Sequence, residues 1–437
     1  MQIFDRFDQY ESNVRTYCRA FPVVFSHAKS AFLIDEQDRT YIDFLSGAGS
    51  LNYGHNNPRL KAAVLRYLEQ DGITLSLDLA TVAKRQFIER FRSTILGPRG
   101  LDYKLQFTGP TGANGVEAAL KLARKVTGRA NVVAFTGAFH GLSAGALAVT
   151  ANTYYRNERF VNRSNVSFLP FEGYVDGLDS SLYLRKAIED TASGVDLPAA
   201  IILETVQAEG GINVASSEWL VKVEAVCREY GILMIVDDIQ VGNGRTGTYF
   251  SFERAGILPD IVVLSKSIGG FGLPMTMVLV KPELDDWQPG EHTGTFRGNN
   301  LAFIAGAEAL SYWEDDQLSE HINRMGHRVA ASLEQLMRQH PETLPRYRGL
   351  GLIWGIEVAD PEMAKAVRRG AFERGLIVEL CGARDNVVKI LPPLTIEESV
   401  LADGLSILEN TIAHVLQSST GPAATASSDV HNPSLVS

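Results

Sequence analysis

The chain has 437 residues, enough for two or three domains of ordinary size, and its 45% hydrophobic and 21% charged residues exclude a disordered protein. Its net charge of −10, without blocks of lysine and arginine, argues against nucleic acid or an anionic membrane as a partner. It has no long apolar run, no signal peptide and only three distant cysteines, so we expect a cytoplasmic protein without a disulfide framework or a metal site.

The N-terminal part of the chain predicts a hairpin followed by helices. Residues 31–45 alternate apolar and polar side chains around the turn sequence DEQDR, which is typical of a hairpin. Residues 58–70 and 79–96 have the spacing of amphipathic helices. We assign residues 1–57 to the first segment of a small domain.

Residues 58–310 predict a large α/β domain with a mostly parallel sheet. Short, nearly all-apolar runs alternate there with helical stretches such as 114–126 and 219–230. The predicted strands are 104–108, 132–135, 199–204, 232–236, 261–264 and 276–280. Strands of this kind are buried on both faces of a sheet, and ligands bind beyond their carboxyl ends. The loops that follow these strands are therefore the place to look for a site.

Residues 311–417 predict a smaller C-terminal α+β domain that the N-terminal hairpin joins. The expected elements, in order, are two helices, a strand at 349–359, a helix at 361–374 and strands near 376–380 and 386–391. Residues 418–437, rich in serine and alanine, predict a flexible tail.

Two glycine motifs match known signatures only weakly. Residues 242–247 read GNGRTG, but five residues separate them from the preceding strand, which favours a glycine-rich turn over a dinucleotide site. Residues 141–145 read GLSAG, but a loop again intervenes. Ser143 as the nucleophile of a serine hydrolase is therefore a remote alternative to a small residue in a tight loop.

The strongest motif is an acid and a lysine at the ends of two successive strands. Asp237 and Asp238 end one strand, and Lys266 directly follows the next, so parallel strands place them at one crevice. Pyridoxal phosphate requires such a pair, because the lysine forms a Schiff base and the acid keeps the pyridinium nitrogen protonated. Apolar and glycine-rich neighbours predict a buried Lys266 with a lowered pKa. The alternative is a solvated surface lysine.

A phosphate site completes this constellation. Residues 107–113, FTGPTGA, end a strand and open a helix, whose free N–H groups bind phosphate well. Phe139 and His140 end the next loop and offer an aromatic platform for a ring. Each feature alone is better explained as a helix cap or a core aromatic, but together with Asp237 and Lys266 they predict a cofactor site.

These features resemble the class III, or omega-type, aminotransferases of pyridoxal-phosphate fold type I. The resemblance covers nearly the whole chain, and its most specific stretches are 43–58, 107–135, 193–216 and 291–303. It implies that Lys266 is the Schiff-base lysine, that Asp237 is the partner of the ring nitrogen, and that the protein is at least a dimer with a shared active site. The other cofactor contacts it implies are Thr111, Gly112, Ala113, Phe139, His140, Gln240 and, from the neighbouring subunit, Thr295.

Within the class, the chain is most similar to the enzymes that move an amino group from L-glutamate to L-aspartate 4-semialdehyde, giving L-2,4-diaminobutyrate and 2-oxoglutarate in ectoine biosynthesis. Ala48 lacks the aromatic ring of ornithine-type members, and Lys389 stands where relatives carry an arginine. Both differences argue against ornithine as the substrate. A related omega-transaminase acting on ornithine, 4-aminobutyrate or another diamine is the main alternative, and a non-catalytic cofactor binder is another.

Three residues are candidates for substrate binding. Arg297 lies next to Thr295, and a guanidinium binds a carboxylate through two parallel hydrogen bonds. Glu209 and Lys389 match, by resemblance, the acid and the cation of a switch in which the acid releases the cation to a substrate carboxylate. The alternatives are a surface or subunit-contact arginine and a static ion pair.

Overall fold

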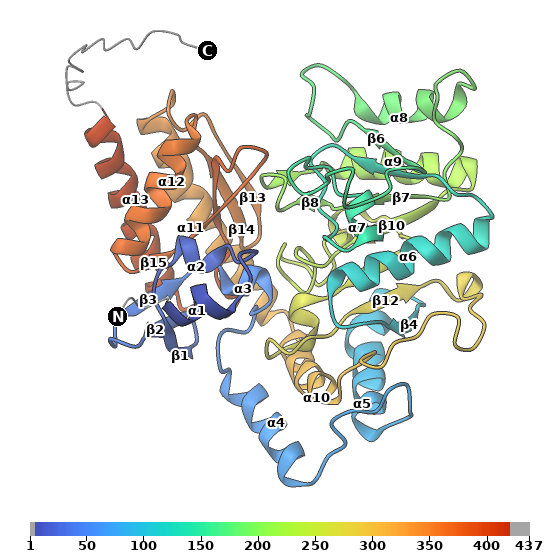
Figure 1. Ribbon diagram of the computed structural model, residues 1–437, viewed down its shortest axis with the longest axis horizontal. Helices are drawn as coiled ribbons and strands as arrows, with labels where there is room; N and C mark the ends of the chain where they lie inside the picture. The colour runs from blue at the N-terminus through green and yellow to red at the C-terminus, as the bar shows by residue number, and fades with distance from the viewer. Residues whose placement is uncertain (1–4, 420–437) are drawn as a thin grey trace, which may run out of the picture.

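The computed structural model describes residues 5–419, which form a large α/β domain and a smaller domain built from both ends of the chain (Figure 1). The large domain has a seven-stranded sheet in the order β4-β12-β11-β10-β7-β5-β6, in which only β12 runs antiparallel to its neighbours. Its strands are β4 (Lys104–Phe107), β5 (Val132–Phe135), β6 (Val166–Leu169), β7 (Ala200–Leu203), β10 (Leu233–Asp237), β11 (Ile261–Leu264) and β12 (Met277–Val280). The predicted, mostly parallel sheet is thus confirmed.

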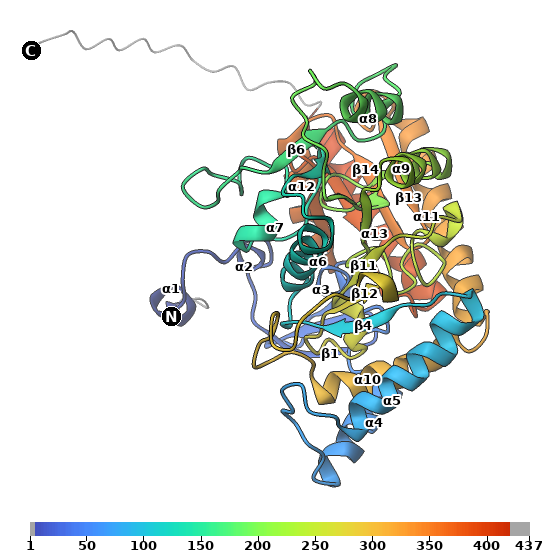
Figure 2. The same ribbon diagram turned by 90° about the vertical axis from the view of Figure 1, so that its right-hand side faces the viewer.

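Helices cover both faces of this sheet because its strands are apolar on both faces. In β7, Ala200 and Ile202 belong to the core that packs against α6 (Gly112–Thr127), whereas Ile201 and Leu203 belong to the core on the side of α9 (Ser217–Tyr230). Figure 2 shows these two helices on opposite sides of the strands. Of the seven strands in this sheet, only β6 was not predicted from the sequence. It lies at the sheet edge and is only partly buried, so it lacks an all-apolar run.

The small domain joins chain ends that are far apart in sequence. β1 (Phe25–Lys29), β2 (Phe32–Asp35) and β3 (Thr40–Asp43) form a sheet with β15 (Leu376–Ile377), and β2 and β3 are the predicted hairpin. A second sheet has the order β13-β14-β17-β16. Its strands are β13 (Arg346–Leu350), β14 (Ile353–Glu357), β16 (Glu379–Cys381) and β17 (Val387–Ile390).

Three C-terminal predictions are wrong in detail. The single strand expected at 349–359 is the hairpin of β13 and β14, whose turn at Gly351 has a φ of +57° and is hidden from sequence analysis by buried apolar neighbours. The strand expected at 376–380 is divided between the two sheets as β15 and β16. A single helix, α11 (Gln317–Gln339), takes the place of two.

The remaining helices frame these sheets. The predicted helix at 79–96 is α5, which Thr81 caps, followed by a π-helical turn at Arg92–Leu96. The predicted 361–374 helix is α12 (Pro361–Glu373). The other helices are α1 (Asp5–Tyr10), α2 (Tyr17–Ala20), α3 (Ser46–Gly49), α4 (Pro58–Glu69), α5 (Val82–Phe91), α7 (Ala144–Ala148), α8 (Ser180–Glu189), α10 (Asn300–Ala309) and α13 (Glu398–Ser419).

The end of the chain lies largely outside the described part. α13 continues through Ser419, so the first two residues of the predicted tail, 418–437, are helical and the rest of it lies outside the described residues. Between residues 5 and 419, no helix is both long enough and apolar enough to span a bilayer.

Candidate active site

Lys266 lies at the carboxyl end of β11, where it begins a short 3-10 helix, Lys266–Gly269. Its φ of +51° is a left-handed conformation that residues other than glycine rarely adopt, and such strain is concentrated at functional sites. The neighbouring Ser267 anchors the turn by donating to the Gly49 carbonyl oxygen at 2.8 Å. Burial lowers the pKa of Lys266 to about 8, although the nearby Glu209 carboxylate opposes this. A substantial fraction of this amine is therefore neutral near physiological pH.

Asp237 ends β10, the parallel neighbour of β11, and is paired with Val263 in the sheet register, three residues before Lys266. Its Oδ2 lies 2.7 Å from Nδ1 of His140, and its Oδ1 accepts a hydrogen bond from the Ile239 backbone N–H at 3.1 Å. Burial disfavours a charged His140, but the hydrogen bond and charge of Asp237 outweigh this and raise the pKa of His140. The histidine thus fixes the orientation of the buried carboxylate.

The start of α6 carries the residues that the sequence predicts to bind a phosphate. Thr111 caps the helix, and its backbone N–H and hydroxyl both donate to Oδ1 of Asn114, at 3.2 and 3.0 Å. The N–H groups of Gly112 and Ala113 have no intrahelical acceptor and can bind an anion. A Cβ atom on Gly112 would lie 2.8 Å from Cδ1 of Ile239, so glycine lets the helix start pack directly on the loop that follows Asp237.

Phe139 and Gln240 belong to the loops that follow β5 and β10. The half-buried Phe139 ring meets the Tyr155 ring edge-on, with centroids 5.8 Å apart. Gln240 donates through Nε2 to the Ala48 carbonyl oxygen at 3.1 Å and to Oε1 of Glu209 at 3.2 Å. Two buried polar atoms, Oε1 of Gln240 and Nε2 of His140, have no hydrogen-bond partner within the described chain. Buried polar atoms are normally satisfied, so each of these two atoms is free to form a hydrogen bond with a bound molecule.

Glu209 and Lys389 form the ion pair that the resemblance implies. Lys389, in β17, is 1% exposed, and its Nζ lies 2.6 Å from Oε1 of Glu209 in the turn between β8 (Val206–Gln207) and β9 (Asn213–Val214). Burial disfavours the charged form of both side chains, which by itself would raise the pKa of Glu209 and lower that of Lys389. The attraction between them nevertheless raises the pKa of Lys389, and Lys389 together with Lys266 lowers the pKa of Glu209. The pair is therefore charged and close to the Lys266 amine.

Thr295 and Arg297 lie apart from this cluster. Thr295 is exposed, and the Arg297 side chain donates through Nη1 to the His292 carbonyl oxygen at 3.3 Å, within its own segment. Neither residue has a contact with Lys266 or Glu209 in the described chain. Their predicted roles therefore require a second copy of the chain to bring them to the site.

The site opens into a cleft of about 810 Å³ between the two domains. Phe139, Tyr155 and Glu209 line it from the large domain, and Arg348 and Cys381 line it from the small domain. Phe139 and Glu209 therefore both face a space large enough to hold a small molecule.

The sequence did not single out a further buried acid, Glu204. It follows the apolar strand β7, the same pattern that revealed Asp237, and its Oε1 accepts the Phe139 backbone N–H at 3.0 Å. Burial raises its pKa, although His140 opposes this. Its contact with the backbone of Phe139 makes it a positioning residue.

The two weak glycine motifs are structural. Within residues 242–247, the fully buried Arg245 donates to the Leu352 carbonyl oxygen at 2.9 Å and to Oδ1 of Asn52 at 2.6 Å, so this turn holds distant segments together. Ser143 precedes α7, and its hydroxyl donates to Oε1 of Glu117 at 2.9 Å. A carboxylate in this position leaves Ser143 without the histidine that a serine nucleophile requires.

Comparison with known proteins gives a consistent result. The family model "Aminotransferase class-III" matches residues 15–412. The chain is 59% identical over 412 residues to a diaminobutyrate–2-oxoglutarate transaminase of Wolinella succinogenes, covering 94% of this chain and 96% of that one. It is 53% identical over 421 residues to the Bordetella parapertussis protein of the same name, covering 96% and 97%.

The chain is also similar to solved aminotransferase structures. An ornithine aminotransferase from Toxoplasma gondii, with pyridoxal phosphate at partial occupancy in its active site, superposes with a TM-score of 0.81 at 28% identity, covering 95% of this chain and 94% of that one.

Proposed function

Since the chain belongs to the class-III aminotransferases, we propose that it moves an amino group from L-glutamate to L-aspartate 4-semialdehyde, giving L-2,4-diaminobutyrate and 2-oxoglutarate. The observation that carries this proposal is the 59% identity, over 94% of this chain, to a transaminase of that name. We assign the reaction to ectoine biosynthesis. The expectation of a cytoplasmic location stays a prediction.

The residues present fit pyridoxal phosphate. When bound, this cofactor supplies an electron sink for the carbon that gains or loses the amino group. Lys266 would hold it covalently, and Phe139 would cover its ring. The N-terminus of α6 would bind its phosphate, and Gln240, whose Oε1 is unpartnered, lies where the family contacts the phenolic oxygen. The unpartnered buried polar atoms support this fit, because a polar ring would satisfy them.

Lys266 would act a second time as a base. Its amine follows the end of β11, and its lowered pKa makes the neutral form available. A neutral amine at that point can take a proton from the reacting carbon of the substrate and return it to the cofactor side. The left-handed backbone at Lys266 fixes where the side chain leaves the sheet.

Asp237 would hold the proton on the ring nitrogen. The carboxylate is buried. His140 contacts its Oδ2, and the Ile239 backbone N–H donates to its Oδ1, so its orientation is fixed. An anion held in a site of low dielectric stabilises an opposite charge more strongly than it does in water. The reaction thus depends on Asp237 being ionised.

The Glu209–Lys389 pair would let one site accept two substrates. Diaminobutyrate presents a terminal amine with no carboxylate on the reacting carbon, so Glu209 and Lys389 stay paired. Glutamate brings an α-carboxylate to the same place, and Lys389 would turn from Glu209 to bind it. Nζ of Lys389 lies 2.6 Å from Oε1 of Glu209, and Glu209 lines the cleft, which supports this role.

We also propose a homodimer in which Thr295 of one subunit reaches the phosphate of the other. Thr81 donates to Oδ1 of Asn300 at 2.8 Å, which places the segment before α5 beside the segment that carries Thr295. Together these segments expose a row of large apolar side chains, more than a monomer ordinarily leaves in water. They are Ile73, Leu75, Leu77, Leu79, Val82 and Phe296.

Initial rates with alternative amino donors test the proposed function. With 2-oxoglutarate as acceptor, diaminobutyrate should give a higher kcat/KM than ornithine or 4-aminobutyrate. A preference for either of those donors would assign the enzyme to another omega-transaminase. Bound cofactor without turnover of any donor would indicate a non-catalytic binder.

A further inference from the structure

The segment between β12 and α10 carries Thr295 at an exposed but closed turn. Residues 293–296 are all exposed. The Arg297 backbone N–H donates to the Gly294 carbonyl oxygen at 3.1 Å, and the Arg297 side chain donates to the His292 carbonyl oxygen at 3.3 Å. The turn that presents Thr295 is therefore fixed with respect to His292. Where the whole turn lies depends on what holds the residues before it.

Trp287 anchors the base of this segment on the large domain. Its ring packs against the apolar core between α6 and the sheet, and its Nε1 donates to Oε1 of Gln106, in β4, at 3.1 Å. The same ring lies beside the ring of His292, with centroids 5.4 Å apart. Trp287 thus connects the sheet to the residue at which the turn of Thr295 begins.

Two lysines of α6 hold Trp287 and the residues that follow it. Lys121 and Lys125 are four residues apart and share one face of the helix, and their Nζ atoms lie 5.4 and 5.9 Å from the centroid of the Trp287 ring. Nζ of Lys121 donates to the Glu291 carbonyl oxygen at 2.7 Å, and Nζ of Lys125 lies 2.5 Å from Oε2 of Glu291. The hydrogen bond from Lys125 lowers the pKa of Glu291, which keeps the acid charged. We call Lys121, Lys125, Trp287 and Glu291 the α6 clamp.

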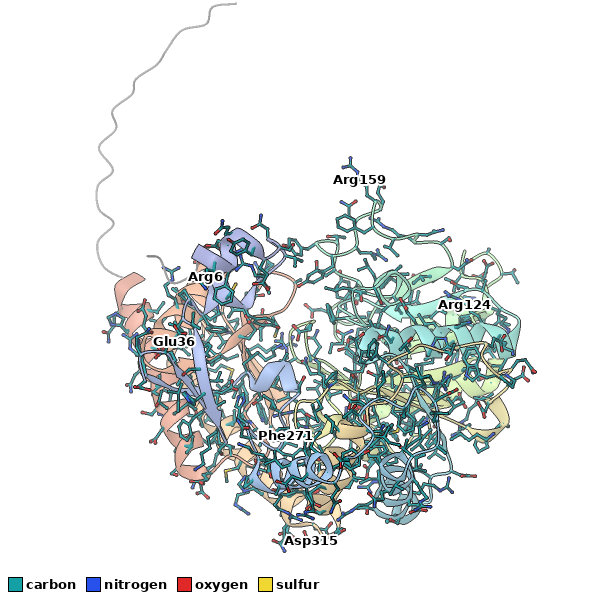
Figure 3. The ribbon with its side chains drawn as sticks, turned by 60° about the horizontal axis from the view of Figure 1, so that its bottom comes forward. Arg6, Glu36, Arg124, Arg159, Phe271 and Asp315 are labelled. Atoms are coloured by element: carbon teal, nitrogen blue, oxygen red, sulfur yellow. The ribbon has the colours of Figure 1, made fainter. Side chains whose placement is uncertain are left out.

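The α6 clamp lies away from the residues that would carry out the reaction. Figure 3 shows Arg124, which precedes Lys125, on the side of the large domain that faces away from the small domain. The N-terminus of the same helix, at Gly112, is the start of the predicted phosphate site. One helix therefore carries a phosphate site at its end and holds, along its side, the segment of Thr295.

We propose that the α6 clamp positions Thr295 for the cofactor phosphate of the neighbouring subunit, and that its four members are positioning residues. This inference rests on the proposed homodimer and names the residues that make its shared contact possible. A hydroxyl bonds a phosphate oxygen only over a narrow range of distance and angle. A segment that is already ordered also loses less conformational entropy when it makes that contact.

Replacing the two lysines tests the inference without removing Trp287 from the core. The ligand is pyridoxamine 5′-phosphate, which has no aldehyde and cannot form a covalent link with Lys266, and calorimetric titration gives its Kd. The double variant Lys121→Met/Lys125→Met should raise this Kd about three- to thirtyfold. Pyridoxamine, which lacks the phosphate, should bind the variant as it binds the wild type. An unchanged Kd for the phosphate compound, or an equal loss for pyridoxamine, overturns the inference.

Lys104→Met is the matched control. It removes another lysine that is paired with this segment, since Nζ of Lys104 lies 2.8 Å from Oδ2 of Asp285, but it leaves the α6 clamp intact. This variant should keep the wild-type Kd. A loss as large as that of the double variant would show that any loosening of the segment has the same effect, and it overturns the specific role of the α6 clamp.

A double-mutant cycle with Thr295→Val separates positioning from general stability. Without the Thr295 hydroxyl there is no contact left to position, so the two lysine replacements should then raise the Kd no further. Losses that simply add would show that the lysines act independently of Thr295, which overturns the inference. Sedimentation should find the lysine variant dimeric at the concentration of the titration. Dissociation into monomers would show that the α6 clamp holds the subunits together instead, and it also overturns the inference.

The Thr295→Val variant alone distinguishes this inference from the proposal on which it rests. If Thr295→Val weakens pyridoxamine 5′-phosphate and the lysine variant does not, only the role of the α6 clamp is wrong. If Thr295→Val leaves the Kd unchanged, the proposed contact between subunits fails, and the inference fails with it.

Discussion

Lys389 and Glu209 lie 2.6 Å apart, from Nζ to Oε1, and they join the two domains beside the cleft that Glu209 lines. A second contact supports the pair, because the Gly382 backbone N–H donates to the Glu209 carbonyl oxygen at 2.9 Å. Glu209 is thus held by its backbone while its carboxylate can exchange partners. This arrangement suits a switch, since the cation can be released without moving the segment that carries the acid.

Replacing Lys389 separates the two half-reactions. Lys389→Met should raise the KM for glutamate and 2-oxoglutarate by about ten- to a hundredfold and change that for diaminobutyrate far less, because only the former bring a carboxylate to this position. Lys389→Arg should keep both half-reactions. Stopped-flow measurement of each half-reaction decides the matter. Equal losses in both would leave only a structural ion pair.

Replacing Lys266 removes the covalent attachment. Lys266→Ala should fold, bind pyridoxal phosphate noncovalently and lose transamination, because no other amine lies at the end of β11. Borohydride reduction followed by mass spectrometry should find labelled Lys266 in the wild type and no labelled residue in the variant. A covalent link that survives in the variant would place the attachment elsewhere.

Asp237 and Asp238 are a matched pair of buried carboxylates. Asp237→Asn should keep the cofactor but lower kcat by about a hundredfold or more, because an amide cannot hold the ring nitrogen protonated. Asp238 instead accepts the Ser251 backbone N–H at 3.1 Å, so Asp238→Asn should change stability more than it changes kcat. If Asp238→Asn loses turnover while Asp237→Asn keeps it, the two roles are reversed.

The pKa of Lys266 predicts a pH dependence. Below about 8 the amine of the cofactor-free protein is mostly protonated and cannot attack an aldehyde, and above that value it is mostly neutral. The rate of covalent reaction with added pyridoxal phosphate should therefore rise with pH, with a midpoint near 8. A midpoint near the ordinary lysine value of about 10.4 would show that burial does not activate this amine.

The sequence predicted what depends on strand pattern and missed what depends on tertiary contacts. Strands β5 and β11 were predicted to the residue because they are apolar on both faces of the sheet. Lys266 and Asp237 followed, since parallel strands end at one edge. The hydrogen bond between His140 and Asp237 joins residues 97 positions apart, and no local pattern reveals it.

We expect the enzyme to exchange the terminal nitrogen of diaminobutyrate, and not its α-nitrogen, with glutamate. Diaminobutyrate labelled with ¹⁵N at only one of the two positions tests this directly when it is incubated with the enzyme and 2-oxoglutarate. The account predicts labelled glutamate from the 4-¹⁵N substrate and unlabelled glutamate from the 2-¹⁵N substrate. Label arriving from the 2-position, or no labelled glutamate from either substrate, would contradict it.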